Sequence, residues 1–294
     1  MNESKIKNLY YMLLIFIALI MCQCDTLEDR SSFLIFKDTK AWNLAKAVRS
    51  QNILTINKQV KEYGVSVDFE DPVYGETVLH LAVKNNLLES VKALLSLGAN
   101  PNHADNHYGQ TVMHNSVGLF NLERDNDTFV LSELLKFGGS PNLLTAFTNH
   151  PNHTGVQESV LNVLCQYARK GTLKLELLIK HGADINYVNE AYHSPLFNSI
   201  NSLNFDKTII LLQHGADYRK ILFKDNSGKQ YLIQDLLKFD LINLDSEDFQ
   251  WKKKVVQFLE ENGIDYRNAP VPPRTLEMIK SNYPNDWEEY LKKF

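Results

Sequence analysis

A short segment recurs along the chain, and this repetition constrains the fold more than any other feature. Each copy is an apolar run at helical spacing that ends in glycine and a small or polar residue. The clear copies are VKALLSLGANPN (91–102), LLKFGGSPN (134–142), LLIKHGADIN (177–186) and LLQHGADY (211–218), and the weaker ones are VKEYGVSVD (60–68) and FLEENGIDY (258–266). Recurrence at a period of this length predicts stacked units of similar shape, about six of them.

A second segment supplies the other half of each unit. Its best copy is GETVLHLA (75–82), followed by GQTVMH (109–114), SVLNVL (159–164) and SPLFNSI (194–200), with AWNLAKAV (41–48) in the first unit. We expect Thr77 to cap a helix through its hydroxyl and His80 to bond the turn before that helix. Gly98 supplies the left-handed residue that ends the second helix of the unit.

The G-x-T-x-L-H-x-A opening and the V-x-x-L-L-x-x-G-A-N-x-N close together resemble the ankyrin-repeat family over residues 35–268. The resemblance implies an all-α solenoid of about six helix-turn-helix units, joined by β-hairpin-like fingers, that binds other proteins. One such unit cannot bury its own apolar face, so stacking must stabilise the array. We assign residues 269–294, which follow a proline cluster, to a C-terminal helical cap.

Insertions interrupt the period. Between Gly64 and Gly263 the terminating glycines lie 34, 40, 44, 33 and 48 residues apart, against a family period of about 33. The extra residues fall near 118–128 and 239–249, between the helices of their units, and near 143–155, in a finger. Insertions in a solenoid map to loops, which often make the binding surface.

The first 24 residues differ from the rest of the chain. Lys5 and Lys7 precede an apolar run of 13 residues (9–21) that ends at Cys22 and Cys24. This order predicts a secretory leader over residues 1–24 and a linker over 25–34, since a membrane-spanning helix needs about 20 apolar residues. Three outcomes stay open: lipidation of Cys22, whose LIMC context resembles a bacterial lipoprotein box, cleavage near Cys24, or retention of the leader as an anchor. We therefore expect export to a bacterial periplasm or attachment to the cell envelope.

The charge balance and the absence of catalytic motifs disfavour two classes of function, nucleic-acid binding and catalysis. The chain carries 31 Lys and Arg against 35 Asp and Glu, and residues 25–294 carry 29 against 34, or −5. Such a balance disfavours nucleic-acid binding, and the membrane is expected only through the leader or its lipid. The sequence contains no G-x-S-x-G, G-x-x-x-x-G-K-[ST] or H-E-x-x-H motif. We predict no enzyme and no cofactor, and we interpret Cys165 as a buried apolar residue.

Two histidine pairs raise the question of a metal. His103 and His107 flank Asp105, and His150 and His153 lie in the enlarged finger. Short histidine spacing suits zinc, but neither pair has an evident third and fourth ligand. An exposed polar loop or a partner contact explains them more simply, so no metal site is predicted.

Tyrosines and histidines at the expected fingers are the candidate partner contacts, because they combine contact area with hydrogen bonding. They are Tyr74, His107, Tyr108, His150, Tyr192 and His193. We expect a non-catalytic binding protein of the cell envelope. A more specific expectation is an immunity protein that sterically blocks a secreted toxic effector such as a phospholipase. Small exported ankyrin proteins resemble the immunity partners of such secreted phospholipases. The alternative is an exported effector that binds host proteins.

Overall fold

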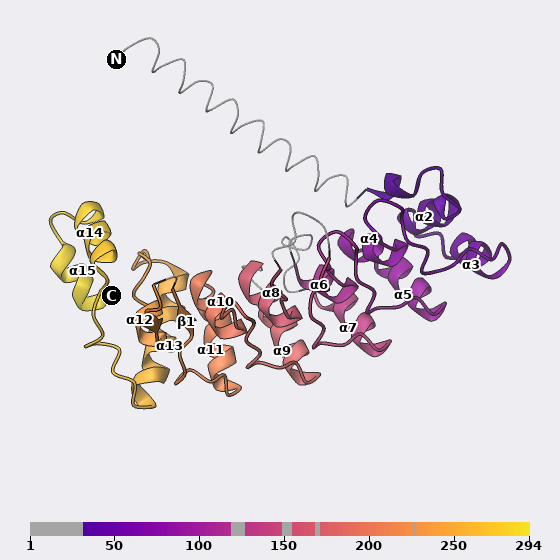
Figure 1. Ribbon diagram of the computed structural model, residues 1–294. Helices are drawn as coiled ribbons and strands as arrows, with labels where there is room; N and C mark the ends of the chain where they lie inside the picture. Colours follow the sequence, from indigo (N-terminus) through magenta and orange to yellow (C-terminus); the bar gives the residue numbers. More distant parts are fainter. Residues whose placement is uncertain (1–31, 119–126, 149–154, 168–170, 226) are drawn as a thin grey trace, which may run out of the picture.

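The computed structural model describes residues 32–118, 127–148, 155–167, 171–225 and 227–294. The predicted leader with Cys22 lies outside these residues, as do His150 and His153. Within them, helices stack in pairs along a curved row, and the chain runs from one end of the row to the other (Figure 1). Neighbouring pairs pack on each other in sequence order, so the contacts are those of a solenoid.

The described residues form six helix pairs, which confirms the predicted architecture. In chain order the pairs are α2 (Trp42–Arg49) with α3 (Ile53–Lys61), α4 (Val78–Lys84) with α5 (Leu88–Ser96), α6 (Val112–Val117) with α7 (Phe129–Lys136), α8 (Val160–Tyr167) with α9 (Thr172–Lys180), α10 (Pro195–Asn201) with α11 (Phe205–Gln213), and α12 (Ile233–Leu236) with α13 (Glu247–Glu261). Most first helices of successive pairs contact one another, and so do most of the second helices. The buried apolar residues form one core that continues from pair to pair.

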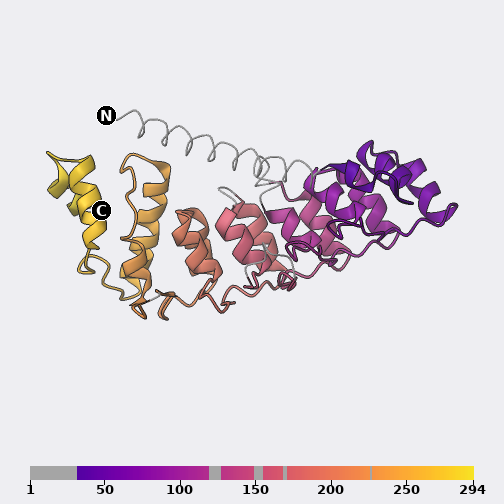
Figure 2. The same cartoon turned by 45° about the horizontal axis from the view of Figure 1, so that its top comes forward.

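Short elements lie at both ends of the array. The 3-10 helix η1 (Phe33–Phe36) packs on α2 and buries two phenylalanines. Beyond α13, helices α14 (Pro273–Asn282) and α15 (Trp287–Lys293) lie at the opposite end (Figure 2). The Tyr290 hydroxyl donates to the carbonyl of Ile242 at 2.6 Å and accepts from its N–H at 3.1 Å. The last helix therefore contacts the insertion between α12 and α13.

The opening motif caps helices as expected. In α6, the Thr111 Oγ1 lies 2.7 Å from His114 Nδ1, and the His114 N–H donates back to that hydroxyl at 3.3 Å. In α4, the Thr77 N–H donates to His80 Nδ1 at 3.1 Å. The second helix of this unit ends at Gly98, whose φ of +91° is the left-handed conformation that the closing motif predicts.

Between units the chain turns back on itself in short antiparallel hairpins. We number these fingers 1 to 5, as residues 65–77, 99–111, 139–159, 183–194 and 216–232. Fingers 1, 2 and 3 each hold one isolated bridge, and finger 5 pairs β1 (Phe223–Lys224) with β2 (Gln230–Tyr231). Finger 3 is the enlarged one, as predicted, because its bridge joins Leu144 to Ser159.

A ladder of asparagines joins successive units and explains why the closing motif ends in this residue. Each side chain accepts a backbone N–H and donates to a backbone carbonyl in the terminating turn of the next unit. Asn102 bonds Ser140 N and Gly138 O, Asn142 bonds Asp184 N and Gly182 O, and Asn186 bonds Asp217 N and Gly215 O. An amide suits this place because it presents one acceptor and two donors.

Buried side chains from the second helices cap the first helices of preceding units. Ser90 donates to the carbonyl of Val48 in the last turn of α2, at 2.6 Å. In the equivalent position of α9, the Lys174 ammonium donates to the carbonyl of Ser116 in the last turn of α6, at 3.0 Å. A cation at this end of a helix interacts favourably with the helix dipole.

Replacing this lysine should therefore loosen the join between the third and fourth units. We expect Lys174→Met to lower the free energy of unfolding by about 2–3 kcal/mol, since it removes a buried charged hydrogen bond but keeps the side-chain volume. Urea unfolding measures the change. Lys180→Met, at an exposed position of the same helix, should change stability by less than about 0.5 kcal/mol. Equal effects of the two substitutions would contradict the capping role.

Candidate interaction surface

An aspartate or asparagine side chain shapes the tip of four fingers. Its oxygens accept the backbone N–H groups of the following turn. Asp71 bonds Val73, Tyr74 and Glu76, Asp105 bonds His107, Tyr108 and Gly109, Asn189 bonds Ala191 and His193, and Asp225 bonds Ser227 and Lys229. None of these four roles was predicted from the sequence. The signal that could have found three of them is an Asp or Asn five or six residues before the Thr or Ser that opens a helix.

Two of these carboxyl groups perform the same task in different surroundings. Burial raises the pKa of Asp71 despite three backbone donors. The hydroxyls of Ser227 and Tyr231 lower the pKa of Asp225 to about 2 in the exposed finger 5. The turn geometry is therefore compatible with both a buried and an exposed finger.

Three predicted contact residues meet at the tips of fingers 1 and 2. The rings of Tyr74 and His107 lie 5.4 Å apart, and those of His107 and Tyr108 lie 4.4 Å apart. The N–H of Asn106 donates to the carbonyl of Tyr74 at 2.8 Å, which joins the two tips. All three rings are half-buried. Because they lie so close together, they form one cluster of aromatic side chains at these tips.

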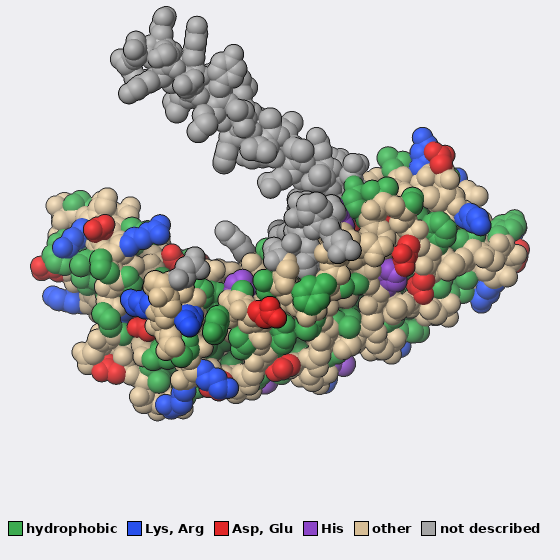
Figure 3. All heavy atoms as spheres, viewed as in Figure 1, with side chains coloured by type: hydrophobic (Ala, Val, Ile, Leu, Met, Phe, Trp, Pro, Cys, Tyr) green, Lys and Arg blue, Asp and Glu red, His purple; other side chains and the backbone are tan. Residues whose placement is uncertain are grey.

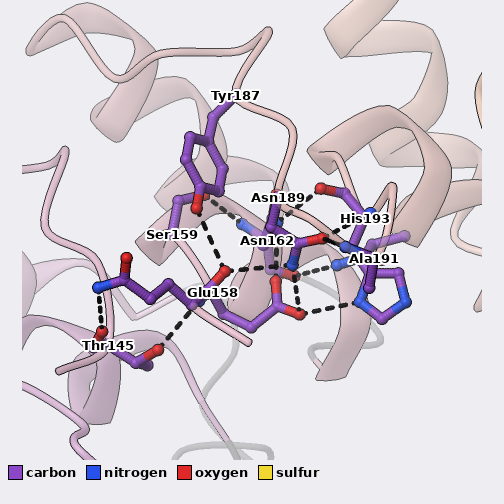
Figure 4. Close-up of polar contacts among 10 residues, drawn as sticks. Thr145, Glu158, Ser159, Asn162, Tyr187, Asn189, Ala191 and His193 are labelled. Atoms are coloured by element: carbon purple, nitrogen blue, oxygen red, sulfur yellow. Dashed lines mark hydrogen bonds and ion pairs between the residues drawn. The ribbon is translucent and has the colours of Figure 1, made fainter. Parts of the chain in front are cut away.

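A polar network joins fingers 3 and 4 around Glu158, a residue that was not predicted as part of a site (Figure 4). His193 Nδ1 lies 2.9 Å from Glu158 Oε1, and Asn189 donates to the same oxygen at 3.0 Å. Asn162 donates to the other carboxylate oxygen at 2.7 Å. His193, a predicted contact residue, is thus held in place by the neighbouring finger. No periodic signal marks Glu158, because it lies at the base of an insertion.

The ring of His193 begins a row of aromatic side chains that continues through the next unit. It stacks on Phe197 at 5.6 Å, Phe197 stacks on Phe223 at 5.1 Å, and Phe223 stacks on Tyr231 at 5.9 Å. Tyr231 then meets Phe239 edge-on at 5.0 Å. Stacked rings of this kind give fingers 4 and 5 a rigid apolar base.

Tyr192 occupies a strained position at the tip of finger 4. Its φ is +62°, whereas the equivalent residues of fingers 1, 2 and 5 are Gly75, Gly109 and Gly228, with φ of +69°, +67° and +86°. A bulky side chain is disfavoured in this conformation. Yet the Tyr192 side chain is 41% exposed, so folding gains little from it.

We expect Tyr192→Gly to raise the free energy of unfolding by about 1 kcal/mol, because it removes backbone strain. If the ring contacts the partner, the same substitution should weaken binding. Urea unfolding and a binding titration separate the two effects. Tyr63→Gly is the matched control, since Tyr63 is exposed and lacks the left-handed backbone. The control should not gain stability, and a loss of stability in Tyr192→Gly would disprove the strain.

A small groove separates fingers 4 and 5, and we call it the interfinger notch. Apolar and polar side chains from both fingers and from α10 line it: Ile185, Asn186, Val188, Ser194, Leu196, Asp217, Lys220, Ile221 and Leu222. Its volume is about 50 Å³. Val188 and Ile221 at the notch are 53% and 41% exposed, so both present apolar surface to the solvent.

The described residues carry no arrangement typical of catalysis or metal binding. His103 Nε2 lies 2.9 Å from Glu70 Oε1, and Asp105 is occupied by the backbone of its turn. No group of three His, Cys, Asp or Glu in the described ranges could hold a metal ion. Burial raises the pKa of the Cys165 thiol to about 12, so the nucleophilic thiolate does not form near neutral pH. None of the described helices has the length and apolar character needed to cross a membrane.

Comparisons with known proteins agree with this geometry. The family model of the ankyrin repeat matches residues 74–106. Two putative ankyrin repeat proteins of Acanthamoeba polyphaga mimivirus are similar: R598 is 30% identical over 91 residues, and R664 is 26% identical over 133 residues. These alignments cover 31% and 42% of this chain, and 29% and 78% of the two viral proteins.

Two solved structures share the fold. The ankyrin repeat domain of Bcl-3, described as a unique member of the IκB protein family, superposes with a TM-score of 0.55 at 24% identity over 76% of this chain and 86% of its own. The ankyrin repeat protein EF0377 superposes with a TM-score of 0.50 at 21% identity over 76% and 98%. The stacked helix pairs and the fingers have the fold of an ankyrin-repeat solenoid, and residues 74–106 match the repeat itself. Ankyrin repeats form protein-interaction modules, which are typically non-catalytic.

Proposed function

We propose that this chain is an exported, non-catalytic protein that binds one protein partner along its fingers. The observation that carries the proposal is the placement of exposed apolar side chains. Four of the five fingers present at least one, namely Val73, Phe147, Val188, Tyr192 and Ile221. Apolar residues that recur along one edge of a folded protein, between polar neighbours, are typical of a protein-binding surface.

The immunity role is the specific form of this proposal. Its support is the secretory leader predicted from the sequence and an array whose insertions make it irregular, which suits a single dedicated partner. In this role the chain covers the active site of a toxic effector, and it acts from the bacterial periplasm or from the envelope through lipidated Cys22. An exported effector that binds host proteins is the alternative, and it differs in location.

Affinity capture tests the binding proposal. The chain, tagged at its C-terminus and expressed in its source cells, should retain one main protein in stoichiometric amount. The variant Val188→Asp should lose this protein, while Lys180→Met, on the exposed face of α9, should keep it. Retention by both variants would place binding away from the fingers and contradict the proposal.

The cellular location of the chain and its ability to protect cells from a toxin distinguish the immunity role from the effector role. For an immunity protein, fractionation places the chain in the envelope, and a secreted lipase or nuclease is encoded beside it. Expression of the chain should then protect cells from that toxin. Absence of protection would contradict the immunity role, and recovery of the chain from the medium or from host cytosol would favour the effector role.

A further inference from the structure

We propose that the interfinger notch takes an aliphatic side chain from a partner segment that is acidic on one side of that residue and basic on the other. This inference rests on the proposed function and names the chemistry of the partner. It follows from three features of fingers 4 and 5: the size and lining of the notch, the opposite charges of the two fingers, and the rigid base beneath them.

The notch has the chemistry of an anchor site for one apolar side chain. Ile185, Val188 and Leu196 contribute from finger 4 and α10, and Ile221 and Leu222 contribute from finger 5. The volume of about 50 Å³ exceeds the roughly 10–15 Å³ that one water needs on the same measure, so the notch can take a small apolar group. The branched end of a valine, leucine or isoleucine suits this space.

The two fingers beside the notch differ in charge. Finger 5 carries Arg219, Lys220, Lys224 and Lys229 against Asp217 and Asp225, so four cations minus two carboxylates give +2. Finger 4 carries Asp184 and Glu190 and no lysine or arginine, or −2. Basic side chains gather visibly on the end of the molecule that holds β1, α12 and α13 (Figure 3). This local contrast stands out on a body whose total charge is only −5.

Finger 5 keeps its net positive charge of +2 although one of its carboxylates pairs with a cation of the same finger. Asp217 pairs with Lys220 at 2.7 Å. Asp225 accepts from the Ser227 and Tyr231 hydroxyls at 2.6 and 2.9 Å. Lys224 and Lys229 are exposed, and neither forms an ion pair with another described residue. Charge complementarity across an interface fixes register and orientation.

The fingers are held rigidly enough to present this pattern in one arrangement. Phe197 and Phe223 stack beneath them at 5.1 Å, and Asn186 bonds the backbone of Asp217 across the two units at 2.8 Å. Binding of a partner therefore costs little conformational entropy at this site. Its acidic flank lies over finger 5 and its basic flank over finger 4.

Selection from a displayed random peptide library on the full chain tests this inference. The enriched peptides should share an aliphatic residue with acidic residues on one side and basic residues on the other. Replacing that aliphatic residue by serine should weaken binding at least about tenfold, or 1.4 kcal/mol. Ile221→Asp should abolish binding, Lys224→Glu should remove the preference for the acidic flank, and Glu190→Lys should remove the preference for the basic flank.

Matched controls separate this inference from the proposed function. Val73→Asp and Lys136→Glu change an exposed apolar residue and an exposed lysine elsewhere, and they should leave peptide binding unchanged. Peptides without the charge pattern, peptides that bind Ile221→Asp as tightly as the parent chain, or no selected peptide would overturn the notch site. If affinity capture still depends on Val188 in that case, the proposed function stands and only this inference fails.

Discussion

Lys84→Met should lower the free energy of unfolding by about 3–5 kcal/mol, the largest effect that we expect from a single substitution. Lys84 forms an ion pair with Glu76, and both side chains are fully buried. Methionine keeps the length of the side chain but leaves the Glu76 carboxylate in the core without this cation. Removal of one partner of a buried pair costs more than the pair itself contributes, because an uncompensated charge stays out of water.

The double variant Glu76→Gln/Lys84→Met identifies the cause. It should recover much of the lost stability, since no buried charge is left behind. Lys92→Met, which breaks the exposed pair of Lys92 with Glu89, should cost less than about 1 kcal/mol. Urea unfolding of the four proteins measures these differences. If Lys84→Met and Lys92→Met have equal costs, the Glu76–Lys84 pair is not buried as described.

Stability should fall steeply in mild acid, because His80 and His114 are buried as neutral caps. Burial lowers the pKa of His80 from 6.5 to about 3 and that of His114 to about 4. The unfolded chain therefore binds more protons, and the stabilisation is present above pH 6.5 and is lost as the pH falls toward the folded values. Between pH 6.5 and 4.5 we expect a loss of roughly 2 kcal/mol for each histidine.

Urea unfolding across this pH range measures the slope. His114→Asn keeps an acceptor for the Thr111 N–H and removes one titrating group, so the slope should fall by about half. His181→Gln and His214→Gln alter exposed histidines and should leave the slope unchanged. A stability that is constant from pH 6.5 to 4.5 in the parent chain would show that these caps are not neutral in the way we infer.

Much of the fold could be predicted because its signals are local and repeated. The Thr–His caps and the terminating glycines act within one or two turns of chain, so each copy of the motif specifies the same helix ends. The period then placed Tyr74 and His107, which occupy neighbouring fingers, close enough for their rings to meet at 5.4 Å. The insertion between α12 and α13 was visible as an excess over the period.

The rest depended on contacts between units that the period does not encode. Glu158 joins His193 and Asn189 from a position at the base of an insertion. From the sequence alone, Lys174 and Lys84 are expected to be exposed, because lysine is almost never buried unless it is paired. Only the stacked structure shows that a helix carbonyl and a carboxylate supply those partners.

The sequence by itself determined the repeated unit, the number of units and the chemistry of their turns, since helix caps, apolar spacing and left-handed glycines are properties of short stretches of chain. The tertiary structure alone decided which polar side chains are buried and paired, and where two fingers of opposite charge lie on either side of the interfinger notch. These features arise between residues of different units, and their energies depend on burial and distance, which no local pattern specifies.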